Sequence, residues 1–334
     1  MSVLRFAKVV SSLPSTLVPN TVYFVRTGAG FDLRVTDATG SIAYDLNPVA
    51  PPSPPPSAPT ASGGIETVIE QGGNFYRVHT FLTSGTLTVT SGGSAEILMV
   101  GGGGSGGSSG PFGGGGGGGA GGLLIGSETL TTGSHSIAVG TGGDFISGNH
   151  IPGNPGADSS AFGLTAIGGG RGGSGNSGGP TLGGSGGGQG AIANSVEFPD
   201  NVSGTAGQGN DGGQALPPNG GGGGGAGAPG GTPPDISTAA NGGDGLQSSI
   251  TGSQVYYAGG GAGSGPTQGE TAINPARGVG GQGGGGGEGS IDGVDGTGGG
   301  GAAGLSNVDR SGKGGDGIVI VRYEITEEEF NDAA

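Results

Sequence analysis

Apolar and polar residues alternate in short runs near the N-terminus, which predicts β-strands. The runs TVYFVRT (Thr21–Thr27) and FDLRVTD (Phe31–Asp37) are rich in β-branched and aromatic residues, and SIAYDLN follows the Asp-to-Gly turn DATG. Together they predict a small β meander within residues 1–47. The stretch PVAPPSPPPSAPTASGG, which starts at Pro48, predicts an extended polyproline spacer instead of a folded segment.

Strand patterns return after this spacer. In residues 66–100, Thr86, Thr88 and Thr90 alternate with Leu87 and Val89, while QGGN and TSG supply hairpin turns. Shorter strands are predicted at GLLIGSETLT, SHSIAVG and SAFGLTAIG. The run GIVIVRYEI (Gly317–Ile325) is continuously apolar, which is typical of a strand buried on both faces. We expect it to complete the sheet that residues 66–100 open.

Between these strands, from Gly101 to Gly315, glycine runs recur without a fixed period. The chain has 93 Gly and 21 Pro in 334 residues, a composition normally associated with low-complexity or disordered sequence. It is only 30% hydrophobic and has no Trp or Cys, so one large apolar core cannot form. Order, if present, must come from main-chain hydrogen bonds. A collagen triple helix is disfavoured because no Gly-X-Y period occurs.

Two states of the glycine region therefore compete: a disordered linker and a bundle of polyglycine II helices. Such helices have no internal hydrogen bonds, so their N–H and C=O groups point outward in three directions. Only glycine lets neighbouring helices approach closely enough to pair on every side. Strand-like segments bracket the region and Lys and Glu are scarce in it, which favours the bundle. Alanine at Gly116 should then disrupt folding more than alanine in an exposed loop.

The predicted fold class is thus mainly β and irregular. We expect an N-terminal β module over residues 1–47, a Pro-rich linker over 48–64, a glycine-rich domain over 65–325 and an acidic tail over 326–334. In the glycine-rich domain, β-strands bracket the polyglycine II bundle.

Charge excludes several kinds of partner. The net charge is −15 with only 10 Lys and Arg, so nucleic acid is not an expected partner. No run approaches the roughly 18 apolar residues that a membrane span needs, so we expect no membrane insertion. The N-terminal residues do not fit a secretory signal, because they lack a clean apolar segment with a small-residue cleavage site.

Nucleotide-binding patterns fail on inspection. Glycines follow the strand EILMV as they do in a dinucleotide site, but no helix former occurs before Leu123 and no basic environment surrounds them. The loop DRSGKGG lacks the Ser or Thr that a phosphate-binding loop places after its Lys. We therefore expect no cofactor.

Metal and catalytic patterns fail as well. The three histidines, His79, His135 and His150, are far apart, and the alternation around His79 predicts a solvated strand face. Asp292 and Asp295 resemble calcium-binding repeats, but the nonapeptide pattern is not met, so we interpret them as turn residues. No glycosidase-like carboxylate pair is evident. We expect no metal ligands and no catalytic residues.

The non-glycine insertions are the candidate contact positions, because the chain must reverse there. They carry aromatic, apolar and charged residues, and variable loops on a rigid scaffold commonly bind partners. The candidate receptor contacts are Phe145, His150, Ile151, Phe198, Asp200, Ile236, Tyr256, Tyr257 and Arg277. For the aromatic ones a second interpretation stays open, in which they cap the bundle ends as small apolar plugs.

The chain resembles the glycine-rich tail-fibre and adhesin proteins of tailed bacteriophages. The opening LPSTLVPNTVYFVRTGAGFDLRVTDATGSIAYDLN resembles an N-terminal tail-fibre module. The segments VHTFLTSGTLTVTSGGSAEILMVGGGGSGG and GKGGDGIVIVRYE resemble the glycine-rich domain of these proteins. The chain lacks the repeat-rich shaft and the coiled-coil heptads of long fibres.

The resemblance implies a non-enzymatic protein of the virion tail that faces the exterior. Residues 1–47 would attach to other tail or baseplate proteins, and the bundle would present loops to a bacterial surface receptor, either protein or polysaccharide. A homotrimer is also implied. One alternative is a head or baseplate fibre or decoration subunit without a dedicated receptor, and another is a polysaccharide depolymerase.

Overall fold

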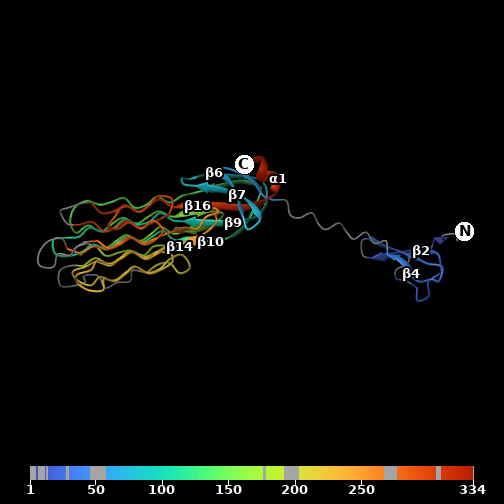
Figure 1. Ribbon diagram of the computed structural model, residues 1–334, viewed down its shortest axis with the longest axis horizontal. Coiled ribbons are helices and arrows are strands. Elements are labelled where there is room, and N and C mark those ends of the chain that lie inside the picture. Colours follow the sequence, from blue (N-terminus) through green and yellow to red (C-terminus); the bar gives the residue numbers. More distant parts are fainter. Residues whose placement is uncertain are drawn as a thin grey trace. The chain divides into compact units, whose positions relative to one another are not determined.

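The chain divides into two compact units, Met1–Ser57 and Ala58–Ala334, each of which we describe by itself (Figure 1). The computed structural model describes residues 5–6, 12, 14–27, 30–45, 58–175, 178–191, 203–266, 277–305 and 310–333. The division falls inside the proline-rich stretch.

The first unit is a four-stranded sheet in the order β1-β2-β3-β4. Its strands are β1 (Arg5–Phe6), β2 (Thr21–Thr27), β3 (Gly30–Thr36) and β4 (Ile42–Asp45). β2, β3 and β4 pair antiparallel, which confirms the predicted meander, and β1 adds in parallel to β2. In the β3–β4 turn, Oδ1 of Asp37 accepts hydrogen bonds from the Thr39 and Ser41 N–H groups at 2.8 and 3.0 Å.

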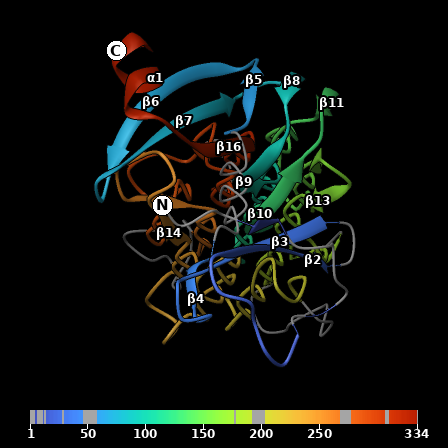
Figure 2. The same ribbon diagram turned by 90° about the vertical axis from the view of Figure 1, so that its right-hand side faces the viewer.

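The described residues of the second unit form several small sheets and one short helix, a mainly β and irregular fold (Figure 2). A five-stranded sheet has the order β10-β9-β16-β7-β6, a three-stranded sheet has the order β11-β8-β5, and two hairpins are formed by β12-β13 and β14-β15. The elements are β5 (Thr60–Ser62), β6 (Ile65–Gln71), β7 (Asn74–Phe81), β8 (Gly85–Ser91), β9 (Gly93–Val100), β10 (Leu123–Leu130), β11 (Gly133–Ile137), β12 (Ser159–Ala161), β13 (Leu164–Ala166), β14 (Leu246–Ser248), β15 (Val255–Tyr257), β16 (Ile318–Ile325) and α1 (Glu327–Ala333).

Strand β16 lies in the middle of the five-stranded sheet, antiparallel to both β7 and β9. The predicted closure of this sheet by the C-terminal strand is confirmed. Residues on one face of the sheet, such as Met99 and Val321, pack against Leu87 of the three-stranded sheet. Residues on the other face, such as Ile320, pack against Tyr257 of the β14–β15 hairpin. Because both faces are covered, β16 is almost wholly buried, as its continuous apolar run predicts.

His79 corrects the prediction of a solvated face, because its side chain is fully buried at 0% exposure. Its Nδ1 lies 2.8 Å from the Gly63 carbonyl oxygen and its Nε2 lies 3.1 Å from the Tyr323 hydroxyl oxygen. The Tyr323 hydroxyl also accepts a hydrogen bond from the Ala61 N–H at 3.1 Å. Nδ1 therefore carries the proton and Nε2 accepts from Tyr323. The alternation of β7 could not reveal this burial, since the chain around Ala61 and Gly63 covers the face.

This environment gives the unit a pH-dependent stability. Burial lowers the pKa of His79 below its ordinary value of 6.5, against opposing effects of the Gly63 carbonyl and the Glu66 charge, while the Arg77 charge also lowers it. Below the ordinary pKa the unfolded chain binds a proton that the folded chain resists, so stability is full above about pH 6.5 and falls on acidification. We expect the thermal unfolding temperature of the wild type to drop from about pH 7 to about pH 5 more steeply than that of His79→Gln. Calorimetry at several pH values measures both slopes, and parallel slopes would contradict the assignment.

Both ends of the glycine-rich unit are more ordered than predicted. Strand β5 lies within the range expected to be linker. In the expected acidic tail, the Thr326 hydroxyl accepts from the Glu329 N–H at 3.2 Å and a Glu329 carboxylate oxygen accepts from the Thr326 N–H at 2.9 Å. This capping box starts helix α1. Phe330 then packs on Phe75 with ring centroids 4.7 Å apart, which holds the helix against the sheet.

The glycine region consists of extended segments that bond to one another with a three-residue period. Gly101, Gly104 and Gly107 donate to the carbonyls of Gly122, Gly119 and Gly116 at 2.9–3.0 Å. Gly102, Ser105 and Ser108 donate to a second segment, at Ala157, Asn154 and Ile151. Gly103 and Gly106 donate to a third, at Gly315 and Gly312. Successive residues thus face three directions, the pattern of threefold polyglycine II helices packed side by side.

Glycine is needed here for space. A Cβ atom on Gly102, Gly103 or Gly104 would lie closer than 3.0 Å to the main chain of a neighbouring segment, a distance that real Cβ atoms essentially never show. The φ angles of these three glycines lie outside the left-handed region. The main chains themselves therefore form the packing surface of the bundle.

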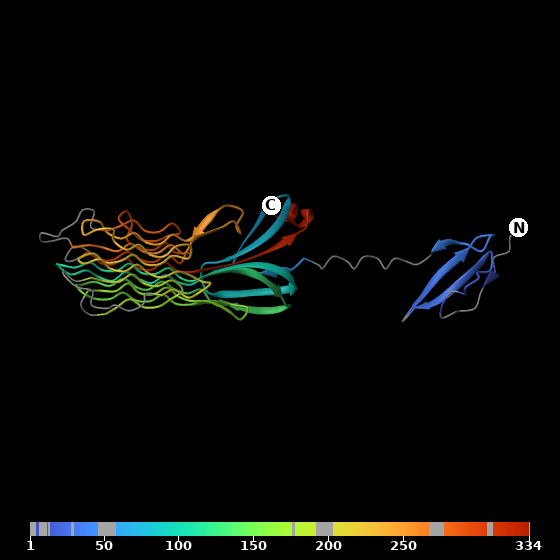
Figure 3. The ribbon, with the colours of Figure 1, turned by 90° about the horizontal axis from the view of Figure 1, so that it is seen from below.

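The segments run side by side away from the sheets and reverse at the opposite end of the same unit (Figures 1 and 3). We call that opposite end the tip. Gly101–Ser109 runs from β9 toward the tip, and the segment from Gly114 returns to β10.

Candidate functional site

Four described turns form a continuous row at the tip. Gly110 and Gly113 close the first turn by a hydrogen bond of 2.9 Å, and the His150 N–H donates to the Ser109 carbonyl beside it at 3.4 Å. On the other side, the Gly114 N–H donates to the Pro218 carbonyl at 2.7 Å. The row is therefore formed by the turns at residues 147–151, 110–113, 216–219 and 235–238.

Side-chain hydrogen bonds fix these turns on the bundle. Asn219 is fully buried, and its Nδ2 donates to the carbonyls of Asp235 and Thr238 at 3.2 Å each. Oδ1 of Asp235 accepts from the N–H and the hydroxyl of Ser237, both at 2.8 Å. The Ser237 hydroxyl is the largest influence that lowers the pKa of Asp235. The turns are thus positioned before any partner arrives.

Large apolar side chains stand exposed on all four turns. The exposed fractions are 41% for Ile151, 60% for Phe112, 37% for Leu216 and 60% for Ile236. We call these four side chains the tip row. Large apolar residues exposed on neighbouring loops of a rigid scaffold are typical of an interaction site.

Sequence reasoning found Ile151 and Ile236 and missed Phe112 and Leu216. The missed signal is the same in both cases: SSGPFGG and ALPPNG interrupt glycine runs with proline and one large apolar residue. His150 lies beside Ile151 with a left-handed φ of 59° and is half-buried.

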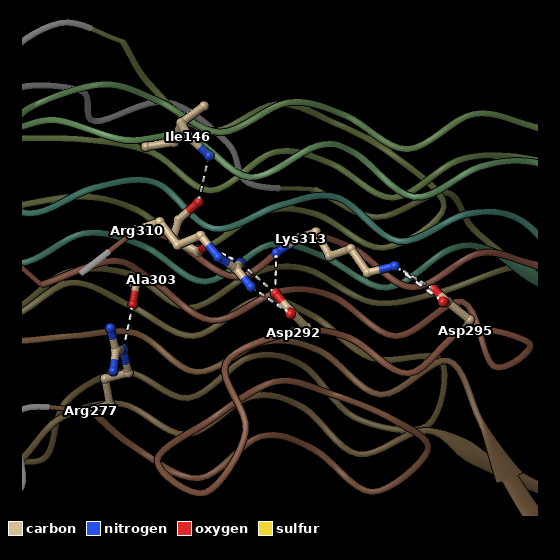
Figure 4. A network of polar contacts seen from close by, with 8 residues as sticks. Ile146, Arg277, Asp292, Asp295, Ala303, Arg310 and Lys313 are labelled. Atoms are coloured by element: carbon tan, nitrogen blue, oxygen red, sulfur yellow. Dashed lines mark hydrogen bonds and ion pairs between the residues drawn. The ribbon is translucent and has the colours of Figure 1, made fainter.

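The remaining candidates are not part of the tip row. Tyr256 and Tyr257 belong to β15, next to the sheets and away from the tip, because the hairpin that carries them packs on the five-stranded sheet. Tyr257 is 4% exposed, and burial raises the pKa of its hydroxyl, so this residue is a structural plug. Arg277 is 8% exposed and its Nε donates to the Ala303 carbonyl at 2.6 Å, so its side chain links two segments of the bundle (Figure 4). Phe198 and Asp200 lie outside the described residues.

Phe145 precedes the tip turn at residues 147–151 and lies in a network with charged residues. The Arg310 guanidinium lies 4.6 Å from the centre of the Phe145 ring and donates two hydrogen bonds to Asp292 at 2.7 and 2.8 Å. Figure 4 shows this pair beside Lys313, whose Nζ contacts Asp295 at 3.0 Å. The Arg310 hydrogen bond is the main reason that the pKa of Asp292 is lowered. Both carboxylates thus hold the returning segment Arg310–Lys313.

Other acidic residues complete the hydrogen bonding of segments at the surface of the bundle. Oδ1 of Asp158 accepts a hydrogen bond from the Gly168 N–H at 2.7 Å. Oδ1 of Asp244 accepts from the Gln282 N–H, and Oδ1 of Asp316 accepts from the Gly142 N–H, both at 2.8 Å. Among the described residues, no main-chain carbonyl accepts from these three N–H groups. These three carboxylates are therefore structural, because each takes the place of a neighbouring main-chain acceptor.

Within the described ranges, no group of three or more His, Cys, Asp or Glu residues could hold a metal ion. No helix in that part of the chain is long and apolar enough to cross a membrane.

Fold and site together define a class of protein: a small β core that carries a glycine-rich bundle with exposed turns at its far end. The chain belongs to the glycine-rich domain family, since the model of that family matches residues 80–324. A comparison with curated proteins finds no match.

Proposed function

We propose that this protein is a non-enzymatic fibre or adhesin of a tailed-bacteriophage virion, and that its tip row binds a receptor on the bacterial surface. The first unit attaches the chain to other tail or baseplate proteins. The glycine-rich unit holds the tip away from the particle. The resemblance of both units to tail-fibre segments supports this assignment.

One observation carries the proposal: four large apolar side chains are exposed on adjacent turns that main-chain and side-chain hydrogen bonds hold in place. Exposing such residues gains nothing for folding, whereas a preorganised set of apolar contacts lowers the ordering cost of binding. Phe112 and Ile236, the most exposed of the four, are the expected main contacts.

The test uses the purified full chain as a competitor of virion adsorption to the host bacterium. We expect the double variant Phe112→Ser/Ile236→Ser to compete at least about tenfold more weakly than the wild type, since truncating a hot-spot contact costs about 2 kcal/mol or more and about 1.4 kcal/mol is a tenfold change in affinity. Val294→Ser is the matched control, because Val294 is 52% exposed at the sheet end of the bundle. Equal competition by wild type and double variant would exclude the tip row as the receptor contact. Antibody labelling that places the chain on the head would exclude a tail fibre.

A further inference from the structure

Strand β10 forms one edge of the five-stranded sheet and pairs only with β9 in that sheet. The register runs from Leu123 opposite Val100 to Leu130 opposite Gly93 without a bulge. The Leu123 N–H points away from β9, because it donates to the Gln208 carbonyl at 2.9 Å. In an antiparallel strand, alternate residues point both main-chain groups to the same side. Ile125, Ser127 and Thr129 therefore also point outward.

These outward groups are open. Among the described residues, no hydrogen bond joins the main chain of Ile125, Ser127 or Thr129 to any segment other than β9. The side chains around them are exposed, with Ile125 at 56%, and a Cβ atom on Gly126 would meet nothing within 4 Å. A row of open N–H and C=O groups is a template for strand pairing.

The opposite edge of the same sheet is protected. Strand β6 carries Glu66 and Glu70, and helix α1 contacts it. Charged residues and covering elements are common ways to prevent edge pairing. Strand β10 carries a single charged residue, Glu128, so its edge is less protected than that of β6.

We infer that β10 pairs antiparallel with β10 of a second copy of this chain, across a twofold axis at Ser127. This register is the one that pairs all three open positions, since Ser127 meets itself and Ile125 meets Thr129. Each such pair exchanges two hydrogen bonds, so about six form. It also places Glu128 opposite Gly126, which avoids the like-charge contact of a register centred on Glu128. The inference is independent of the proposed function.

The twofold contact makes a cross-linking test unusually specific, because the chain has no cysteine. Directly opposite residues in such a pair have Cα atoms about 5.5 Å apart, a separation that a disulfide spans. In the full chain under mild oxidation, we expect Ser127→Cys to form a disulfide-linked dimer at least about tenfold faster than Ser134→Cys. Ser134 is the matched control, since it is an exposed strand serine on β11. Equal rates would overturn the inference.

Sedimentation of cysteine-free protein provides the second measurement. We expect the wild type to form dimers in a concentration series, and Ile125→Lys and Ser127→Pro to stay monomeric. Lysine protects an edge, and proline removes one outward N–H that the β9 ladder does not use. Circular dichroism identifies a variant that fails to fold, and the sedimentation of the other variant then tests the pairing. A wild type that stays monomeric, forms trimers, or forms dimers that survive both substitutions would overturn the proposed pairing.

Discussion

Gly116→Ala is expected to destabilise the glycine-rich unit by more than about 3 kcal/mol, because it combines overpacking with the loss of main-chain hydrogen bonds. The Gly116 N–H donates to the Gly173 carbonyl at 2.9 Å, and its own carbonyl accepts from the Gly107 N–H at 2.9 Å. Its third direction faces Gly188, whose carbonyl a Cβ atom would meet at less than 3.0 Å. That neighbour cannot retreat without breaking the Gly188 hydrogen bond to Gly117.

Calorimetry of the full chain measures the effect as a shift or loss of the transition of the larger unit. Gly289→Ala is the matched control in the same region, since Gly289 is exposed, has no left-handed φ and would place its Cβ more than 4 Å from other atoms. We expect the control to change stability by no more than about 0.5 kcal/mol. If the larger unit unfolds at the same temperature in both alanine variants, the packing argument for glycine is wrong.

The sheets could be predicted because each strand has its own pattern of apolar and polar residues. The apolar run Gly317–Ile325 predicts a doubly buried strand, and β16 is one. The run predicts a place inside the sheet that residues 66–100 open, but it does not say that β7 and β9 are the neighbours of β16. His79 shows the limit of such reasoning, since alternation within one strand carries no information about a distant segment such as Ala61–Gly63 that covers its face.

The type of helix in the bundle could be predicted, but the order of the segments could not. Glycine runs predict threefold helices in contact, but every run offers the same main chain, so the sequence does not say which segments are neighbours. Side chains at the surface add contacts that differ from one segment to another. Asp158, Asp244 and Asp316 each accept from one specific N–H group. Read alone, these residues are typical of turns, and their partners lie 10, 38 and 174 positions away.

The sequence predicts that turns between glycine runs carry candidate contacts, but it identifies only some of the turns at the tip. Insertions between glycine runs mark reversals of the chain, but reversals occur at both ends of the bundle. Ile236 lies in a tip turn, whereas Tyr257 lies in a hairpin that packs on the sheet. The direction of each segment separates the two cases, and it depends on the order of hydrogen-bonded neighbours. Phe112 was missed because it is a short interruption of an otherwise continuous glycine run.

Arg322→Met is expected to destabilise the unit by about 2–4 kcal/mol, because it removes the one guanidinium that several groups share. Arg322 is 8% exposed and lies 4.5 Å from the centre of the Tyr76 ring. Its Nη1 donates to Oε1 of Gln71 at 2.6 Å and lies 3.3 Å from the carbonyl oxygens of both Ser249 and Ile250. Those carbonyls belong to the loop of the β14–β15 hairpin. Methionine keeps an apolar stem but removes the arginine donor from Oε1 of Gln71 and from the Ile250 carbonyl, whereas the Ser249 carbonyl still accepts from the Gly252 N–H at 2.9 Å and from Nε2 of Gln71 at 3.3 Å.

The loss should be local and should not come mainly from the ion pair with Glu96. The Glu96 side chain is 48% exposed, so water can solvate it, and we expect Glu96→Gln to cost less than about 1 kcal/mol. Hydrogen exchange of the full chain distinguishes the two variants. Arg322→Met should lose protection across the hairpin residues 246–257, while protection in β9 and β16 is kept by their main-chain ladder. Unchanged hairpin protection in Arg322→Met, or equal loss in Glu96→Gln, would show that apolar packing of Ile250 and Tyr257 holds the hairpin without the arginine.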